Sequence, residues 1–296
     1  MTISLFNILL PSIELASVYG LVAIAVLVAF RIANFADLTI DGSFALGGAI
    51  SAVALVNGMS PGLALLLGAV GGAGAGAFTA ILHTRIGVNR LLAGIITMTI
   101  LYSINLRVMG RSNTSLLDKV VIFDLLPAGT IRVAGGVVMI LLVAGLLWAF
   151  LRTELGHFVR AAGENPKVVV RRGFTEESLL LVSLPLANAI AAFAGGLVVQ
   201  QQGFADVGMG TGIVIVCLAA LMLGEAVLPP SSIPRLLGAG LIGMLLYQIL
   251  VTIALRLGLN PWDLKLSTGA LLILALVAKR YLLTQRGIAN IGSDPL

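Results

Sequence analysis

Long runs of apolar residues, separated by short polar segments, dominate the chain. A helix needs about 20 apolar residues to cross a bilayer, and most of these runs reach or approach that length. The pattern predicts an all-α polytopic membrane protein with about nine transmembrane or re-entrant helical segments. We expect these segments at residues 8–30, 42–56, 61–82, 91–109, 133–151, 179–201, 208–223, 233–255 and 264–283.

The second run, residues 42–56, is shorter than a full helical crossing requires. It follows the polar stretch 31–41, which contains one arginine and two aspartates. Non-helical backbone at membrane depth is tolerated only where protein or a water-filled cavity satisfies its polar groups. We therefore predict a broken or re-entrant helix here, beside a path for a solute.

Residues 151–178 form the longest polar interruption in the chain. Five of the eighteen Lys and Arg residues lie there, and such an excess of cations marks a cytoplasmic loop. We expect one short helix at residues 157–162, ended by the stretch Gly163 to Pro166, and a second helix beginning at Pro166. A solvated connection between two spans is the simpler alternative.

The distribution of positive charge predicts an orientation in the membrane. With nine segments, twelve Lys and Arg residues fall on the side of residues 151–178, and six fall on the opposite side. Because cations concentrate in cytoplasmic loops, we expect the N-terminus outside and the C-terminus inside. No Lys or Arg precedes Arg31, so we expect the first span to be retained rather than removed as a signal peptide.

A repeated tripeptide predicts how the segments are organised. Phe-Ala-Asp at residues 35–37 recurs at 204–206, and each copy follows one span and precedes a short, glycine-marked apolar run. The first copy follows an out-to-in span and the second an in-to-out span, so the units would be inverted repeats, a recurrent plan in transporters. The predicted parts are a first repeat with a linking fifth span at 1–150, a cytoplasmic loop at 151–178, a second repeat at 179–283 and a cytoplasmic tail at 284–296.

We place the solute path between the two repeats, where the helices are interrupted. Each aspartate there has an alternative role, because Asp37 and Asp41 are placed to cap the second helix. Phe35, Phe204 and Met209 are expected to pack rather than to recognise a solute. The candidate path residues are Asn34, Phe35, Asp37, Asp41 and Ser43 in the first break, Gln202, Phe204, Asp206 and Met209 in the second, and Tyr102 and Asn105 on one face of the fourth span. For Tyr102 and Asn105, contact with another helix is the simpler alternative.

Three glycines in the third span, Gly68, Gly72 and Gly76, recur at intervals of four residues. This spacing puts them on one helix face and predicts a seam where another helix packs closely. A phosphate-binding loop is the competing interpretation, but that loop needs a Gly-Lys pair, and no Lys follows a Gly in this chain. ATP hydrolysis by that route is excluded.

Composition agrees with a membrane protein and argues against other classes. Hydrophobic residues make up 59% of the chain, charged residues 10%, and the mean hydropathy is +1.09. The net charge of +5 comes from cations at the ends of spans rather than from one basic face, so we expect no nucleic acid partner. Cys217 lies in an apolar run, which leaves no disulfide framework. His83 and His157 are expected at the surface and form no recognisable catalytic or metal site, so we do not expect an enzyme.

Several motifs carry a resemblance to a known family. The spacing R-A-A-G-E-N-P-(x6)-G-F, from Arg160 to Phe174, resembles the coupling loop of ATP-binding cassette (ABC) importer permeases of the branched-chain amino acid and ribose type. The stretches 34–39, 41–43 and 202–206 resemble the narrower tryptophan/tyrosine-type branch. The resemblance implies that the loop contacts a separate ATPase subunit through Arg160, Ala161, Gly163, Glu164, Asn165, Pro166, Arg171 and Gly173.

The same resemblance implies partners and a solute. The chain is expected to work as a homodimer in the bacterial cytoplasmic membrane, with two ATPase subunits and an extracytoplasmic substrate-binding protein. ATP and Mg²⁺ are expected on the ATPase and no cofactor on this chain. An amino acid, aromatic in the first instance, is the expected solute. The competing hypotheses are a secondary transporter with Asp37, Asp206 or Glu225 as cation sites, and, more remotely, a scaffold without transport.

Overall fold

The computed structural model describes residues 5–125, 130–165, 169, 173, 175–260, 263, 266–270 and 273 of the chain. Within this part, seven helices are long and apolar enough to cross a membrane. They confirm the all-α polytopic fold. The long helices are α1 (Leu5–Leu27), continued by the π-helix η1 (Val28–Ile32), α2 (Thr39–Val56), α3 (Pro61–Thr84), α4 (Arg90–Met109), α5 (Thr130–Leu151), α8 (Glu176–Gln202) and α10 (Ile233–Arg256).

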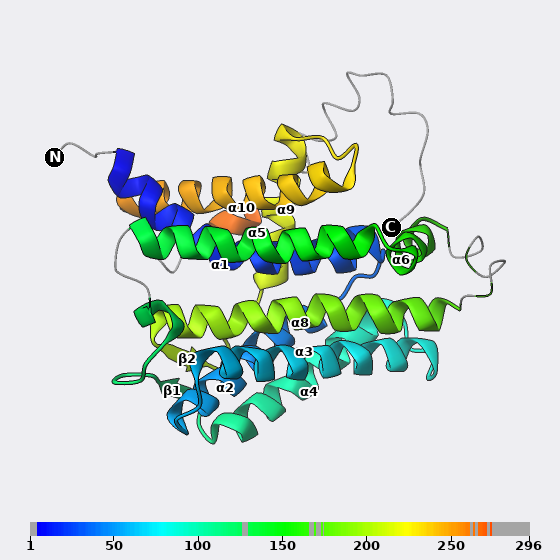
Figure 1. Ribbon diagram of the computed structural model, residues 1–296, viewed down its shortest axis with the longest axis horizontal. Helices are drawn as coiled ribbons and strands as arrows, with labels where there is room; N and C mark the ends of the chain where they lie inside the picture. The colour runs from blue at the N-terminus through cyan, green and yellow to red at the C-terminus, as the bar shows by residue number, and fades with distance from the viewer. Residues whose placement is uncertain are drawn as a thin grey trace.

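Shorter elements mark the two ends of the helix bundle (Figure 1). Helix α6 (Glu154–Glu164) lies at one end. The strands β1 (Asn113–Ser115) and β2 (Phe204–Asp206) form an antiparallel pair at the other end, near the 3-10 helix η2 (Ile122–Leu125). Helix α9 (Ile213–Val227) runs across the direction of the long helices.

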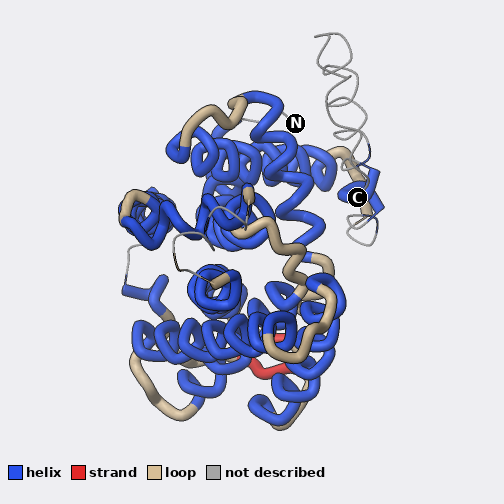
Figure 2. The backbone as a smooth tube through the Cα atoms, turned by 90° about the vertical axis from the view of Figure 1, so that its right-hand side faces the viewer, coloured by secondary structure: helices blue, strands red, loops and turns tan. Residues whose placement is uncertain are grey.

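The helices pack in two groups that do not follow chain order. Helices α2, α3, α4 and α8 contact one another, and α1, α5, α9 and α10 form the second group. Contact between α1 and α8 joins the groups, and these two helices run in opposite directions (Figure 1). In Figure 2, which looks onto the end that carries α6, the first group fills the lower half of the molecule. The N-terminal and C-terminal parts of the chain are therefore interleaved.

Helix α2 corrects the prediction of a broken segment at residues 42–56. The helix is continuous from Thr39 to Val56, and most of its residues are buried. Its 18 residues span about 27 Å at 1.5 Å per residue, close to the hydrocarbon thickness of a bilayer. Gly47 of this helix packs against the Ala192 carbonyl of α8, so that glycine permits close contact and does not interrupt the helix.

Helix α9 corrects a second boundary. The sequence predicts a span at residues 208–223, but the helix begins at Ile213 and ends at Val227. Residues 207–212 form turns instead, because the glycines at 208, 210 and 212 favour non-helical backbone and Gly212 adopts a left-handed conformation with φ of +84°. The break before α9 is consequently longer than the pattern of apolar residues predicts.

Two predicted elements fall mainly outside the described residues. They are the helix expected to begin at Pro166 and the ninth span at 264–283, of which only 266–270 and 273 are described as helical. The expected tail at 284–296 also lies outside them.

The glycine seam of α3 is confirmed. Gly68 faces the backbone of Gly47 in α2, while Gly72 and Gly76 face the backbone of α8. A methyl group at Gly72 would collide with the Asn188 carbonyl, and one at Gly76 with the Leu184 carbonyl. In lipid the hydrophobic effect does not drive helices together. Helices associate there through close packing, which small residues such as glycine permit.

We predict that Gly76→Ala destabilises the protein by about 1–3 kcal/mol, because backbone atoms of α8 must move to accommodate the methyl group. The matched control is Gly74→Ala on the same helix, where a Cβ meets nothing within 4 Å. Thermal unfolding in detergent measures the difference. Equal midpoints of thermal unfolding for the two variants would contradict close packing of α3 against α8 at Gly76.

Candidate functional site

The first break in the helices, residues 33–38, is organised by Asp37. Its carboxylate is fully buried, and Oδ1 accepts a hydrogen bond of 2.9 Å from the backbone N–H of Thr39 at the start of α2. Burial raises the pKa of the Asp37 carboxyl, and hydrogen bonds from Thr39 and Asn188 oppose that rise. The capping interpretation is thus confirmed for Asp37.

Asn188 of α8 ties the break to the rest of the bundle. Its Nδ2 donates to Asp37 Oδ2 at 2.7 Å, and its Oδ1 accepts from the Ser43 hydroxyl of α2 at 2.7 Å. Asn188 was not among the sequence candidates. The only available signal is a polar amide inside the apolar run 179–201. Ser43, a predicted path residue, is buried in this network.

Buried hydroxyl groups extend the network into α3 and α4. Thr39 and Thr79 lie 2.7 Å apart between their Oγ1 atoms, and Thr79 donates to Thr97 at 2.9 Å. Thr97 in turn donates to the carbonyl of Ala93. The four helices of the first packing group are therefore joined by polar bonds at the level of the first break.

Asp41 caps a different helix from the one predicted. Its carboxylate accepts hydrogen bonds from the N–H groups of Gly212 at 2.8 Å and Val214 at 2.9 Å, at the start of α9. The prediction that Asp41 caps its own helix is wrong, because Asp41 lies within the first turn of α2 and points across to α9. Since a helix N-terminus carries partial positive charge, this carboxylate stabilises α9 from the other packing group.

The second break, residues 203–212, resembles the first locally. Asp206 Oδ1 accepts from Gly208 N at 2.8 Å, two residues ahead, as Asp37 does from Thr39. The Gln202 side chain is exposed and donates a hydrogen bond to the Phe204 carbonyl at 2.7 Å.

Side chains around the second break divide into packed and exposed. Phe204 is 42% exposed, so it is not part of the buried core of this chain. Met209 does pack as expected, with its sulfur against Gly48 of α2.

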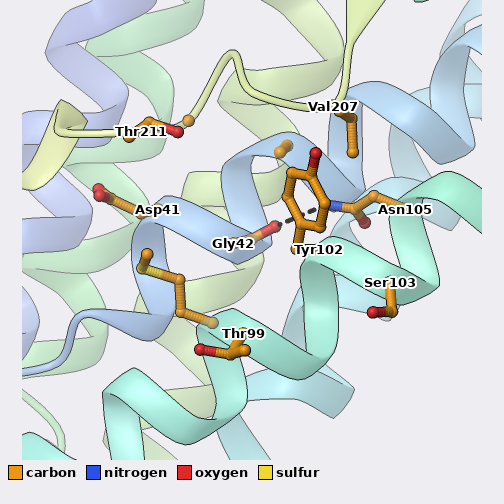
Figure 3. Close-up of a pocket in the computed structure, with 11 residues that line it drawn as sticks. Asp41, Gly42, Thr99, Tyr102, Ser103, Asn105, Val207 and Thr211 are labelled. Atoms are coloured by element: carbon orange, nitrogen blue, oxygen red, sulfur yellow. Dashed lines mark hydrogen bonds between the residues drawn. The ribbon is translucent and has the colours of Figure 1, made fainter. Parts of the chain in front are cut away.

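A cavity of about 280 Å³ lies between α2, α4 and the second break (Figure 3). Tyr102 and Asn105 of α4 lie beside Gly42, with Val207 and Thr211 across from them. Asn105 donates to the Gly42 carbonyl at 3.5 Å. Of the predicted path residues, the cavity is lined by Asp41, Tyr102 and Asn105, and the remaining lining residues are Gly42, Ala45, Met98, Thr99, Ser103, Val207, Gly210 and Thr211.

The other predicted path residues do not line this cavity. Phe35 is fully buried and meets the ring of His83 edge-on at 5.4 Å, which confirms its packing role. The His83 side chain lies in the last turn of α3 and is 21% exposed, so it is partly buried at the edge of the bundle. Asn34 is exposed and adopts a left-handed conformation with φ of +50°.

Helix α6 contains the short helix predicted in the polar loop, with longer bounds. Thr153 caps it through a hydrogen bond from Gly156 N, and Gly156 and Val159 are buried against the bundle. The opposite face is exposed at Glu154, His157 and Glu164.

The candidate coupling residues occupy different surroundings. Arg160, Ala161 and Gly163 are partly buried, whereas Glu164, Asn165 and Gly173 are exposed. Pro166 and Arg171 lie outside the described residues.

Glu225, a candidate cation site in the secondary-transporter hypothesis, forms an ion pair with Arg31 at the end of η1. Its side chain is 7% exposed, whereas that of Arg31 is 40% exposed. The pair fastens the end of α9 to the end of the first span. Among the described residues, no group of three or more His, Cys, Asp or Glu side chains is placed to hold a metal ion.

Sequence comparisons relate the chain to membrane permeases. Residues 8–276 match the family model described as "Branched-chain amino acid transport system / permease component". The "Tyrosine transport system permease protein" of Clostridioides difficile is 33% identical over 262 residues, covering 88% of this chain and 87% of that protein. No solved structure matches the chain.

Two further relatives extend the comparison. "Uncharacterized protein RP368" of Rickettsia prowazekii is 29% identical over 279 residues, covering 91% of this chain and 97% of that protein. The "Autoinducer 2 import system permease protein LsrC" of Escherichia coli is 30% identical over 142 residues, which is 48% of this chain and 41% of that protein. These relationships favour an importer permease over a secondary transporter.

We predict that Asp41→Ala exposes the start of α9. Two N–H groups lose their acceptor, and because a lost capping interaction costs about 0.5–2 kcal/mol, amide exchange at Gly212 and Val214 should accelerate about tenfold. Hydrogen–deuterium exchange of the purified protein measures this. Asp206→Ala is the control, since its effect should be confined to the Gly208 turn. Unchanged exchange at the start of α9 would argue against the cap.

Proposed function

Because the chain belongs to the family of branched-chain amino acid transport system permease components, we propose that it is the membrane subunit of an ABC importer for a small amino acid solute. The family relationship over residues 8–276 carries this proposal. The fold supports it with a bundle of long apolar helices, two helix interruptions and a polar helix at one end. The chain is a transport subunit and not an enzyme.

An aromatic amino acid is the first solute to test. The relative named for tyrosine transport aligns with most of this chain, and the cavity beside α4 is bordered by hydroxyl and amide groups as well as apolar side chains. Ligand sites commonly combine an apolar lining with a few polar groups that fix orientation. A volume of about 280 Å³ suits a small solute.

Helix α6 is the proposed contact with the ATPase subunit. It is amphipathic, since Gly156 and Val159 face the bundle while Glu154, His157 and Glu164 face outward. A short rigid helix at the end of the bundle can receive motion from a neighbouring subunit without crossing the membrane. ATP and Mg²⁺ would be bound by that ATPase.

A second copy of the chain is proposed to face α4. Thr99, Tyr102 and Ser103 are exposed on this helix, and Tyr102 is 51% exposed. Hydroxyl groups on a membrane-spanning surface suit a polar path or a protein interface better than lipid. A homodimer that meets on this side would enclose the cavity. An extracytoplasmic binding protein would deliver solute to the opposite end from α6.

The decisive test of function is reconstitution in vesicles with the partner ATPase and binding protein. We expect ATP-dependent accumulation of tyrosine, with no accumulation when only a proton or sodium gradient is supplied. Radiolabelled uptake with tyrosine, tryptophan and leucine measures rate and preference. Uptake by this chain alone, driven by a gradient, would contradict the importer assignment.

We further expect α6 to face the cytosol, which gives the proposed N-out and C-in orientation. Glu164→Cys should react with a membrane-impermeant maleimide only in inside-out vesicles, because Glu164 is exposed at the end of α6. Lys119→Cys, in the loop between α4 and α5, should react only in right-side-out vesicles. Labelling of position 164 from outside would remove the basis for contact with an ATPase.

A further inference from the structure

Helix α6 packs directly onto the first break. A Cβ at Gly163 would collide with the carbonyl oxygen of Ile32, the last residue of η1, and would also crowd Ala33. The absence of a side chain at Gly163 therefore lets the end of α6 rest on the backbone just before the break. Any displacement of this end of α6 presses on the chain at Ile32 and Ala33.

Arg90 connects the same break to the start of α8. Its Nη1 donates to the carbonyl of Asn34 at 3.0 Å, and its Nη2 donates to Glu176 Oε1 at 2.7 Å. The guanidinium group can do both because its N–H donors form a rigid planar fork. Asn34 has φ of +50°, an uncommon conformation for a non-glycine residue, so the carbonyl that Arg90 holds belongs to a backbone turn of unusual geometry.

The first break, Arg90, α6 and α8 border one small pocket. A partly open pocket between the break, Arg90, α6 and α8 has a volume of only about 10 Å³, close to the smallest volume that holds one water molecule. Ala33, Arg90, Ala162 and Glu176 are among the residues that line it. Because so little free volume remains, the elements around it cannot slide far past one another without being displaced together.

Hydrogen bonds connect the break to the elements around the cavity. Asp37 is bonded to Thr39 at the start of α2, and Asp41 one turn further on caps α9. Asp41 also borders the cavity that contains Tyr102 and Asn105. A chain of direct contacts thus runs from α6 through the break to the proposed solute path.

We propose that Arg90 is a positioning residue that locks the first break to the start of α8, so that the break and α6 move as one unit when the ATPase subunits close. This inference rests on the proposed importer function. It assigns the contacts through which a displacement of α6 by the ATPase subunits reaches the solute path. Arg90 touches neither solute nor ATP in this scheme. Its loss should uncouple hydrolysis from transport rather than stop hydrolysis.

A neighbouring ion pair provides a matched control. Arg85 Nε donates to Glu177 Oε1 at 2.6 Å, joining the same two regions of the chain as Arg90 and Glu176. The hydrogen bonds of Arg85 do not include an atom of the break, whereas those of Arg90 do. Both pairs are partly exposed, and exposed pairs contribute little to stability, so both variants should fold.

The experiment measures solute transported per ATP hydrolysed in vesicles that contain the whole importer. For Arg90→Met we expect this ratio to fall at least fivefold, with ATPase activity and melting temperature close to those of the wild type. For Arg85→Met we expect a ratio within twofold of the wild type. A ratio for Arg90→Met within twofold of the wild type, or an equal fall for Arg85→Met, would overturn the proposal.

Exchanging the two charged residues tests the ion pair separately from the hydrogen bond to the break. Arg90→Glu combined with Glu176→Arg keeps opposite charges at these positions, but the new carboxylate cannot donate to the Asn34 carbonyl. We expect the ratio to stay low in this double variant. Full recovery would show that the ion pair alone suffices and would overturn the assigned role of the bond to Asn34.

A cross-link tests the shared motion without removing Arg90. Ala33→Cys and Ala162→Cys place thiols around the same small space, and the native Cys217 is fully buried. If the break and α6 move together, joining the two thiols directly as a disulfide, with copper phenanthroline as the oxidant, should leave at least half of the transport rate. Abolition of transport by the bridge, in a variant active before bridging, would overturn the proposal.

Measurements on the wild-type importer distinguish an error in the proposed function from an error in the role of Arg90. If the wild-type complex shows no ATP-dependent uptake, the proposed function itself is wrong and the role of Arg90 falls with it. If the wild type couples hydrolysis to uptake and the Arg90 variants do so equally well, only the role of Arg90 is wrong.

Discussion

The need to satisfy polar groups inside an apolar bundle governs how the starts of α2 and α9 are held after the two breaks. Backbone N–H groups freed by a break find no water in the hydrocarbon region, so side chains must accept their hydrogen bonds. Asp37 does this at the start of α2, and Asp41 does it at the start of α9. Asn188 then supplies donors and acceptors from a third helix. The interruptions are consequently defined structures with fixed geometry.

Close packing between backbones makes that arrangement possible. Gly47 of α2 and Gly72 and Gly76 of α3 bring their helices against the backbone of α8. Asn188 lies on this stretch of α8, so the same seams that pack the helices also place its amide beside Asp37. Since α8 follows the polar loop and α2 precedes it, the seams join the two parts of the chain. Dispersion contacts and buried hydrogen bonds therefore support each other.

Close backbone contact and hydrogen bonds to a break also occur together at the end of the bundle that carries α6. Gly163 allows close approach to Ile32, and Arg90 bridges Asn34 to Glu176. Contacts continue from the break through Asp37 and α2 to Asp41, beside the cavity. The proposed importer function would use such a continuous path, because the ATPase subunits would act on α6 while the solute moves through the bundle. Rigid contacts with little free volume transmit displacement better than loosely packed ones.

The sequence by itself determined the class of the molecule, most helices and the positions of both breaks, because these depend on local apolar periodicity and on turn-forming residues. It also identified Asp37 as a helix cap and the glycines of α3 as a seam. Only the tertiary structure decided that α2 is unbroken, that Asp41 caps α9, that Phe204 is exposed and that Asn188 and Arg90 hold the first break. The contacts of Asp41, Asn188 and Arg90 depend on which distant segments come together, and the pairing of residues 56 to 171 positions apart leaves no trace in local pattern. The parts of the chain are interleaved, so Asp37, Asp41 and Ser43 each have a hydrogen-bond partner in the other half of the chain.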